Sequence, residues 1–257
     1  EPLVHNPLVG ENLREHRYVA VDWKVKSGSS NHSLQGIGLL AAVLRYFLLS
    51  SGPMTDAAHE VGGFIKTRPE LTRPDAQIGS MLVTMSIGAN GAPVLDKFPG
   101  MRVLGYFTRP ESRGWTHITS KDPAESPAIN ANHFAEEIDR RTAVDLFKWL
   151  RRLGRQPALS QWITEETGKG AAFQTDEEIA ANLLLLGGTS FHIAGTAAMG
   201  ADETSVLDPQ LRVRGVDGLR VCDTSIMPTL VSGNTNAPAM AIAMNAADII
   251  LSAKANS

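Results

Sequence analysis

The chain has 257 residues, of which 43% are hydrophobic and 20% charged, a balance typical of a globular protein with one large or two smaller domains. The net charge of −3 gives no electrostatic reason to expect nucleic acid or an anionic membrane as a partner. The single cysteine, Cys222, excludes an intrachain disulfide and slightly favours a reducing, cytoplasmic compartment. No apolar run reaches the roughly 18 residues of a membrane-spanning helix, so we expect a soluble protein.

The first half of the chain has the pattern of a mainly antiparallel sheet. Residues 1–16 form a turn-rich connector, and residues 18–25 alternate between polar and apolar side chains, which predicts a strand. Residues 34–49 predict an apolar helix, broken by Arg45, that we expect to be buried or to line a channel. Further strands are predicted over 60–67, 76–87, 101–107 and 114–119.

The second half of the chain is dominated by helices. Residues 132–153 carry apolar side chains on one face, which predicts an amphipathic helix. Residues 175–186 predict another helix, with Thr175 as its cap and Glu178 at the capping-box position. Residues 236–252 are apolar on all sides, so we expect a buried helix. Short strands are expected over 211–213 and 219–221.

Two motifs near the C-terminus carry the candidate chemistry. The first, Phe191–Gly200, places His192 three residues before a Gly-Thr pair. The second, Ser232–Pro238, runs directly into the predicted apolar helix. A neutral imidazole is a good proton acceptor near neutral pH, and the N-terminus of a helix carries a partial positive charge. Together they are what a flavin-dependent oxidation of an alcohol needs.

The segment 191–251 resembles the C-terminal signature of the glucose-methanol-choline oxidoreductases. The shared pattern begins with His192-x-x-Gly195-Thr196-x-x-Met199-Gly200, with Ile193 where the family usually has proline. It continues through 206–228 and ends with Ser232-Gly233-Asn234-x-Asn236. Towards the N-terminus, Val9–His16 resembles the family pattern Val-Gly-x-Asn-Leu-x-Asp-His, and the segments 64–77 and 109–123 fit more loosely.

The resemblance implies an α+β fold class: a mainly antiparallel sheet flanked by helices, with the chain ends completing a Rossmann-like FAD-binding domain. It assigns residues 1–17 to a connector of the FAD domain, 18–189 to a substrate-binding domain and 190–257 to the C-terminal part of the FAD domain.

The turn that holds the dinucleotide pyrophosphate in such proteins, Gly-x-Gly-x-x-Gly, does not occur in the sequence. Residues 36–41 fit only its looser form, and they follow a polar break instead of a strand. We therefore expect an N-terminal FAD-binding half as a partner, on a separate chain or as a cleaved fragment.

Two residues are the catalytic candidates. By resemblance, His192 takes the hydroxyl proton of the substrate; the alternative is a structural hydrogen bond in the core. Asn234 matches the family position that holds a second histidine or an asparagine, so its amide would orient the substrate oxygen. The alternative for Asn234 is a turn or a helix cap. The other histidines lack such a context and are expected to be structural or solvated: His5, His16, His32, His59, His117 and His133.

Five residues are candidates for contacts with the cofactor, FAD. Thr235 and Asn236 start the last helix, with Asn236 as the expected N-cap. The positive end of that helix would favour the negative charge of a reduced flavin near its N1–C2=O edge. Asn234 directly precedes these two residues. By resemblance Asp223 and Thr224 also contact the flavin, whereas without the resemblance they would be interpreted as a turn.

These assignments predict FAD-dependent oxidation of a small-molecule alcohol to a carbonyl, with hydride passing to flavin N5 and electrons then to O2 or a quinone-like acceptor. Hydroxynitrile lyase-type cleavage on the same scaffold is the alternative, since it would use the same base. A regulatory domain that binds a partner and no flavin fits poorly with the motifs. The carboxylate pairs Asp56/Glu60 and Glu165/Glu166 could suggest a glycosidase, but we expect them to be solvated surface groups.

Overall fold

In the computed structural model, which describes residues 4–255, the chain forms two compact units. Unit 1 contains Glu1–Arg17, Thr108–Asp139 and Thr189–Ser257, and unit 2 contains Tyr18–Phe107 and Arg140–Gly188. The contacts therefore group Thr108–Asp139, which lies inside the expected substrate-binding domain, with the two ends of the chain.

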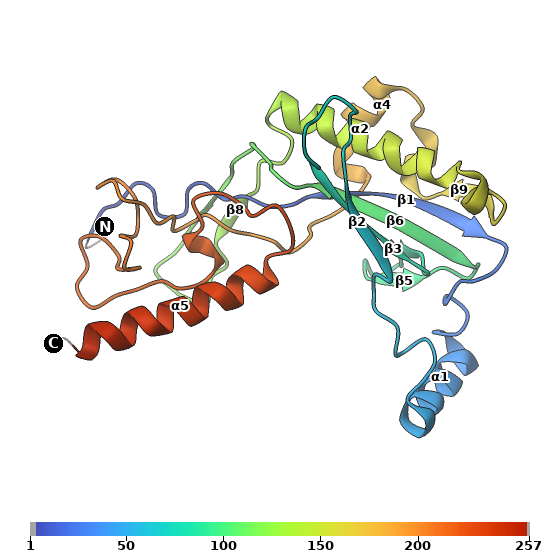
Figure 1. Cartoon of the computed structure of the whole chain (residues 1–257), viewed down its shortest axis with the longest axis horizontal. Helices are drawn as coiled ribbons and strands as arrows, with labels where there is room; N and C mark the ends of the chain where they lie inside the picture. The colour runs from blue at the N-terminus through green and yellow to red at the C-terminus, as the bar shows by residue number, and fades with distance from the viewer. Residues whose placement is uncertain (1–3, 256–257) are drawn as a thin grey trace. The chain divides into compact units, whose positions relative to one another are not determined.

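Unit 2 is built on a five-stranded antiparallel sheet with the strand order β2-β3-β6-β1-β9 (Figure 1). Its strands are β1 (Tyr18–Val25), β2 (Val61–Ile65), β3 (Ala76–Met81), β6 (Gly100–Phe107) and β9 (Ile163–Thr167). A separate hairpin joins β4 (Met85–Ile87) and β5 (Pro93–Leu95). The combination of helices with an antiparallel sheet confirms the predicted fold class.

One face of this sheet is buried under helix α2 (Glu137–Gly154), which runs across it in Figure 1. The side chains of α2 that are fully buried are Leu146, Phe147 and Leu150. The apolar side chains of β1 on the buried face are Val19, Val21, Trp23 and Val25. Gly154 packs so tightly on Trp23 that a Cβ atom would come within 2.4 Å of the indole. The apolar side chains that repeat every second residue in β1 and those on one face of α2 thus pack into one core.

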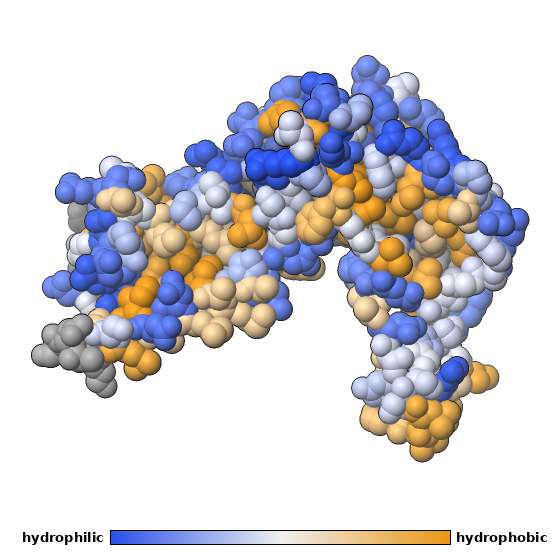
Figure 2. All heavy atoms as spheres, in the orientation of Figure 1, coloured by the Kyte–Doolittle hydropathy of each residue, from blue (hydrophilic) through white to orange (hydrophobic). Residues whose placement is uncertain are grey.

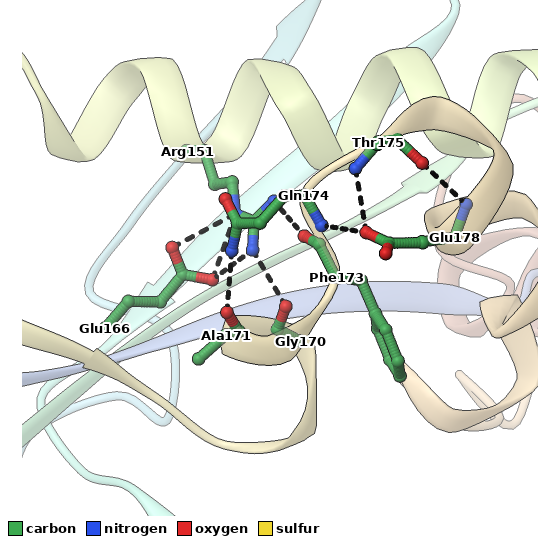
Figure 3. Close-up of polar contacts among 8 residues, drawn as sticks. All are labelled: Arg151, Glu166, Gly170, Ala171, Phe173, Gln174, Thr175 and Glu178. Carbon is green, nitrogen blue, oxygen red and sulfur yellow. Dashed lines mark hydrogen bonds and ion pairs between the residues drawn. The ribbon is translucent and has the colours of Figure 1, made fainter.

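A buried arginine links α2 to β9 and the turn that follows (Figure 3). The Arg151 guanidinium donates to both carboxylate oxygens of Glu166 at 2.8–3.0 Å, and to the carbonyl oxygens of Gly170 and Phe173 at 2.8 and 2.7 Å. Glu165, next to it on β9, pairs with Lys24 in solvent. The interpretation of Glu166 as a solvated carboxylate is therefore wrong, because it neutralises a buried cation.

The remaining helices of unit 2 are short apart from α1 (Gly36–Leu49): α3 (Pro157–Ser160), η1 (Lys169–Ala172), α4 (Asp176–Ala181) and η2 (Leu183–Leu185). The start of α4 has the predicted capping box (Figure 3). Thr175 Oγ1 accepts from the Glu178 backbone N–H at 3.2 Å, and the Glu178 carboxylate accepts from the Thr175 N–H at 3.0 Å. The predicted helix of 175–186 becomes α4 followed by η2.

Helix α1 is apolar but is covered by little of the described chain. Ala42 is its one buried residue, whereas the side chains of Ile37 and Phe47 are 88% and 77% exposed. Figure 2 shows the resulting hydrophobic surface over α1. Within the described residues the expectation of a buried helix is wrong, and the alternative, a segment that lines a channel, stays a prediction. Within residues 4–255, no helix combines the length and apolarity needed to cross a membrane.

Unit 1 is organised by loops around one long helix, α5 (Asn236–Ala255). Its other elements are the hairpin of β7 (Trp115–His117) and β8 (Ala128–Asn130), and the short helix η3 (Thr224–Ile226). The predicted strands 211–213 and 219–221 are present only as isolated bridges. One face of α5, centred on Ala246, packs against a core of Val206, Leu207, Leu211 and Ile226. Met244, outside that face, is 72% exposed, so α5 is not buried all round as expected.

Candidate active site

Two segments far apart in the sequence pair in an antiparallel way and carry the candidate catalytic base. Arg14 and Ala194 exchange backbone hydrogen bonds at 2.9 and 3.0 Å, and Arg17 bridges to Thr189. The segment between Thr189 and Ala194 is longer than its partner between Arg14 and Arg17, and the extra length is absorbed at Phe191, whose φ is +59°. This bulge turns His192 towards the opposite segment.

His192 lies against a second histidine in the interior of unit 1. The Nδ1 atoms of His192 and His16 are 3.0 Å apart, and the two rings meet edge to face. His16 Nε2 is 3.1 Å from the carbonyl oxygen of Thr108. His16 is 0% exposed and His192 is 8% exposed. The structure thus connects three separate segments of unit 1 through one chain of polar contacts.

A buried carboxylate fixes the backbone at the same place. Glu15 Oε1 accepts from the backbone N–H of His192 at 2.9 Å, and Glu15 Oε2 accepts from the Thr189 hydroxyl at 2.6 Å. Burial lowers the pKa of His192, while the negative charge of Glu15 partly opposes this. Burial also lowers the pKa of His16, to about 4. Both imidazoles are therefore neutral at neutral pH.

Neither His16 nor Glu15 was among the expected site residues, and His16 was expected to be structural or solvated. Its contact with His192 spans 176 residues of sequence, so no local pattern reveals it. The available signal is the Glu15-His16 pair at the end of the Val9–His16 motif, where an acid and a histidine stand side by side.

The turn after His192 requires glycine. Gly195 has φ +95°, and a Cβ atom there would lie 2.4 Å from the carbonyl oxygen of Asn12. The Asn12 amide donates to the carbonyl oxygens of Gly195 and Pro228 at 3.3 and 3.2 Å. Only a residue without a side chain fits a left-handed backbone this close to a neighbouring strand. The glycine of the Gly-Thr pair is thus required by the backbone geometry next to His192.

The segment with Asp223 and Thr224 lies beside the His192 motif. The Thr224 hydroxyl donates to the carbonyl oxygen of Ile193 at 2.9 Å, and Ala197 N–H donates to the Ser225 carbonyl at 2.9 Å. Asp223 is exposed and caps η3, with Oδ1 accepting from Ser225 N–H at 2.8 Å. The structure therefore places Thr224 against Ile193, the residue that follows His192, and leaves the Asp223 side chain at the surface of unit 1.

The loop before α5 is held at the segment that contacts His16. Arg109, next to Thr108, donates weakly to the Ser232 hydroxyl at 3.4 Å. Asn234 and Asn236 are exposed, and Thr235 is buried. The first α-helical hydrogen bond runs from Ala239 N–H to the Thr235 carbonyl at 2.8 Å. Thr235 therefore occupies the N-cap position, and the expectation that Asn236 is the cap is wrong by one residue.

The fold and these motifs are similar to those of the C-terminal part of flavoprotein oxidoreductases. Residues 110–243, a little over half of the chain, match the family model described as GMC oxidoreductase, and the chain belongs to this family. The cofactor of the family is FAD, which the descriptions of two similar solved structures also name.

Among curated proteins, an oxygen-dependent choline dehydrogenase of Paraburkholderia phytofirmans is 36% identical over 251 residues, covering 97% of this chain and 44% of that protein. An alcohol dehydrogenase [acceptor] of Pseudomonas putida is 33% identical over 264 residues, covering 97% of this chain and 45% of that protein. Formate oxidase from Aspergillus oryzae has the same fold, with a TM-score of 0.88 at 23% identity, and the match covers 100% of this chain and 49% of the formate oxidase chain. The chain therefore spans less than half the length of the relatives it matches.

Proposed function

We propose that the chain forms the substrate-binding domain and the C-terminal flavin contacts of an FAD-dependent enzyme that oxidises an alcohol to a carbonyl, with His192 as the proton acceptor. The observation that carries the proposal is the setting of His192: it is buried, burial lowers its pKa, and neighbouring groups hold both its backbone and its ring. An alcohol carbon gives up hydride readily only as its oxygen loses a proton, and a fixed neutral imidazole suits that step.

Asn234 completes the catalytic pair in this proposal. It cannot act as a base, but its amide can donate a hydrogen bond to the substrate oxygen and hold the reacting carbon in place. The exposed position of Asn234 at the start of α5 leaves its side chain accessible to a small molecule. The proton would move from the substrate hydroxyl to the His192 ring, and the Glu15 charge would stabilise the imidazolium that forms.

The chemistry of the surrounding donors suits FAD. The backbone N–H groups of Asn236 and Ala237 lie in the first turn of α5, where the helix has no carbonyl to accept from them. With the Thr235 N-cap and the exposed Asp223 carboxylate and Thr224 segment, they offer donors for an anionic edge and an acceptor for hydroxyl groups. FAD supplies the hydride acceptor of the reaction when bound.

The partners of the chain follow from the same proposal. An N-terminal half with the pyrophosphate-binding turn completes the FAD site, the substrate is a small-molecule alcohol, and O2 or a quinone-like compound takes the electrons. The relatives described as choline and alcohol dehydrogenases support a small alcohol as substrate.

The experiment that tests the proposal is anaerobic stopped-flow reduction of the enzyme-bound flavin by a series of alcohols, with His192→Ala. We expect the reduction rate to fall about 10²- to 10⁴-fold, the usual range for loss of a general base. His117→Ala is the matched control, because His117 is an exposed histidine of the same unit and pairs with Glu11 at the surface. An unchanged rate in His192→Ala would refute the role of His192. An enzyme whose flavin stays oxidised with every alcohol, and which cleaves a cyanohydrin, would indicate the lyase.

A further inference from the structure

The contact between His16 and His192 restricts where their protons are. A carbonyl oxygen can only accept a hydrogen bond, so the His16 Nε2 atom, 3.1 Å from the Thr108 carbonyl oxygen, carries a proton. Burial keeps His16 neutral above pH values of about 4, where its pKa lies. A neutral imidazole with a proton on Nε2 has a bare Nδ1, which can act only as an acceptor.

The position of the proton on His192 follows from its position on His16. The two Nδ1 atoms are 3.0 Å apart, a hydrogen-bond distance that needs one proton between them. Because His16 Nδ1 is bare, that proton is on His192 Nδ1. In neutral His192 the unprotonated atom is then Nε2.

We propose that His16 is a positioning residue that holds His192 in the Nδ1–H tautomer, so that Nε2 is the atom that accepts the substrate proton. This role rests on the proposed function of His192. When Nε2 takes the proton, the Nδ1–H group of the imidazolium still donates to His16 and becomes a charge-assisted hydrogen bond. Glu15 is an ionisable group that faces the pair, and its charge also favours the imidazolium.

The test compares two amide replacements of His16 in the complete flavin-bound enzyme. The amide of His16→Asn reaches the position of the original Nδ1, where its oxygen can accept from His192. The amide of His16→Gln reaches the position of Nε2, where it can donate to Thr108 but offers His192 no acceptor. Both variants keep a buried polar side chain and each loses one of the two hydrogen bonds.

We expect His16→Gln to slow flavin reduction about 10- to 100-fold at saturating alcohol, less than the roughly 10²- to 10⁴-fold loss expected when the base itself is removed, and His16→Asn to recover most of that loss. The acid limb of the pH profile of kcat/KM should move to lower pH in His16→Gln, because the imidazolium loses its acceptor. Equal losses in both variants that follow only thermal stability or flavin content would overturn the proposal and leave His16 a packing residue.

Failure of this proposal differs from failure of the proposed function. If His192→Ala is inactive while His16→Gln keeps the rate and pH profile, His192 is the base but His16 does not position it. If neither His16 variant folds, ¹⁵N spectra of histidine-labelled wild-type enzyme decide the question, with His192→Ala used for assignment. A protonated Nδ1 and a bare Nε2 on His192 support the proposal, and the opposite tautomer refutes it.

Discussion

His16 combines complete burial with an ionisable ring. Its 0% exposure means that a charged imidazole would lose its hydration, and the carbonyl of Thr108 does not replace that hydration. Burial therefore lowers the pKa of His16 to about 4, with smaller effects from the Thr108 carbonyl, which raises it, and from His192, which lowers it. The same property that makes His16 a fixed acceptor makes the protein sensitive to acid.

This sensitivity has a definite sign. The pKa of His16 is lower in the folded state than the ordinary histidine value of 6.5, so between pH 6.5 and about 4 the unfolded state binds more protons. Stability should fall as the pH falls through this window and should be unaffected by His16 above it. We expect about 2 kcal/mol of His16-linked loss between pH 7.5 and pH 5.

The measurement is urea unfolding of the flavin-bound enzyme at several pH values, comparing wild type with His16→Asn. His133, whose pKa burial also lowers to about 4, is present in both proteins, so its contribution cancels in the difference. The variant should lose less stability than the wild type on acidification. Identical pH dependence of the two proteins would show that His16 is not buried as a neutral ring.

At the level of single elements, local sequence patterns predicted several elements, and the errors come from backbone angles and long-range contacts that the patterns do not show. The strand at Tyr18–Val25 and the Thr175 capping box were predicted from neighbours in sequence and are confirmed. The helix predicted from residue 132 begins at Glu137, because Asn132 and Phe134 have φ near +50 to +60°. The strand predicted over 76–87 is divided, since Thr84 N–H donates to the buried Asn31 side chain.

Two adjacent residues of β9, Glu165 and Glu166, lead to a prediction about stability. Glu166 neutralises Arg151, which is 7% exposed. Glu165 forms an ion pair with Lys24 instead, and the side chains of Glu165 and Lys24 are 59% and 44% exposed. Glu166→Gln should cost about 3 kcal/mol of unfolding free energy, because it leaves a buried guanidinium without its counter-charge. Glu165→Gln should change stability by less than about 0.5 kcal/mol.

Chemical denaturation of the two variants and the wild type is the measurement. The two substitutions are chemically identical and one position apart, so their difference isolates the effect of burial. Equal stabilities of the variants would contradict the view that the Arg151 network holds α2 against β9. The sequence alone suggests no such difference, because Glu165 and Glu166 look equivalent until the sheet places them on opposite faces of β9.

For the whole molecule, the fold class and the choice of His192 as a candidate followed from the sequence, whereas the surroundings of His192 did not. The antiparallel sheet follows from alternation within single strands, and the motif at 191–200 contains the proposed base, His192. The contacts of His192 come from the segment around His16 and, through it, from Thr108, which lie far away in the sequence. Their roles depend on burial and proton positions, which only three-dimensional packing determines.

The distribution of flavin-binding groups leads to the last prediction. The proposed contacts of this chain, at Asp223, Thr224 and the start of α5, are a few hydrogen-bonding groups, of which Asp223, Asn234 and Asn236 are exposed. The glycine-rich turn that holds a pyrophosphate is absent from the sequence. A few hydrogen bonds without a closed site do not outweigh the entropy lost when a large ligand is immobilised.

The 257-residue chain alone, incubated with FAD and desalted, should therefore keep no stoichiometric flavin, whereas a protein that includes the N-terminal half should keep it. Visible absorption of the desalted samples measures this, and a far-UV circular dichroism spectrum with the expected helix and sheet content confirms that the chain tested is folded. One flavin per chain in the folded, isolated sample would refute the proposal that a partner half completes the site, because the chain would then hold the cofactor through its own residues.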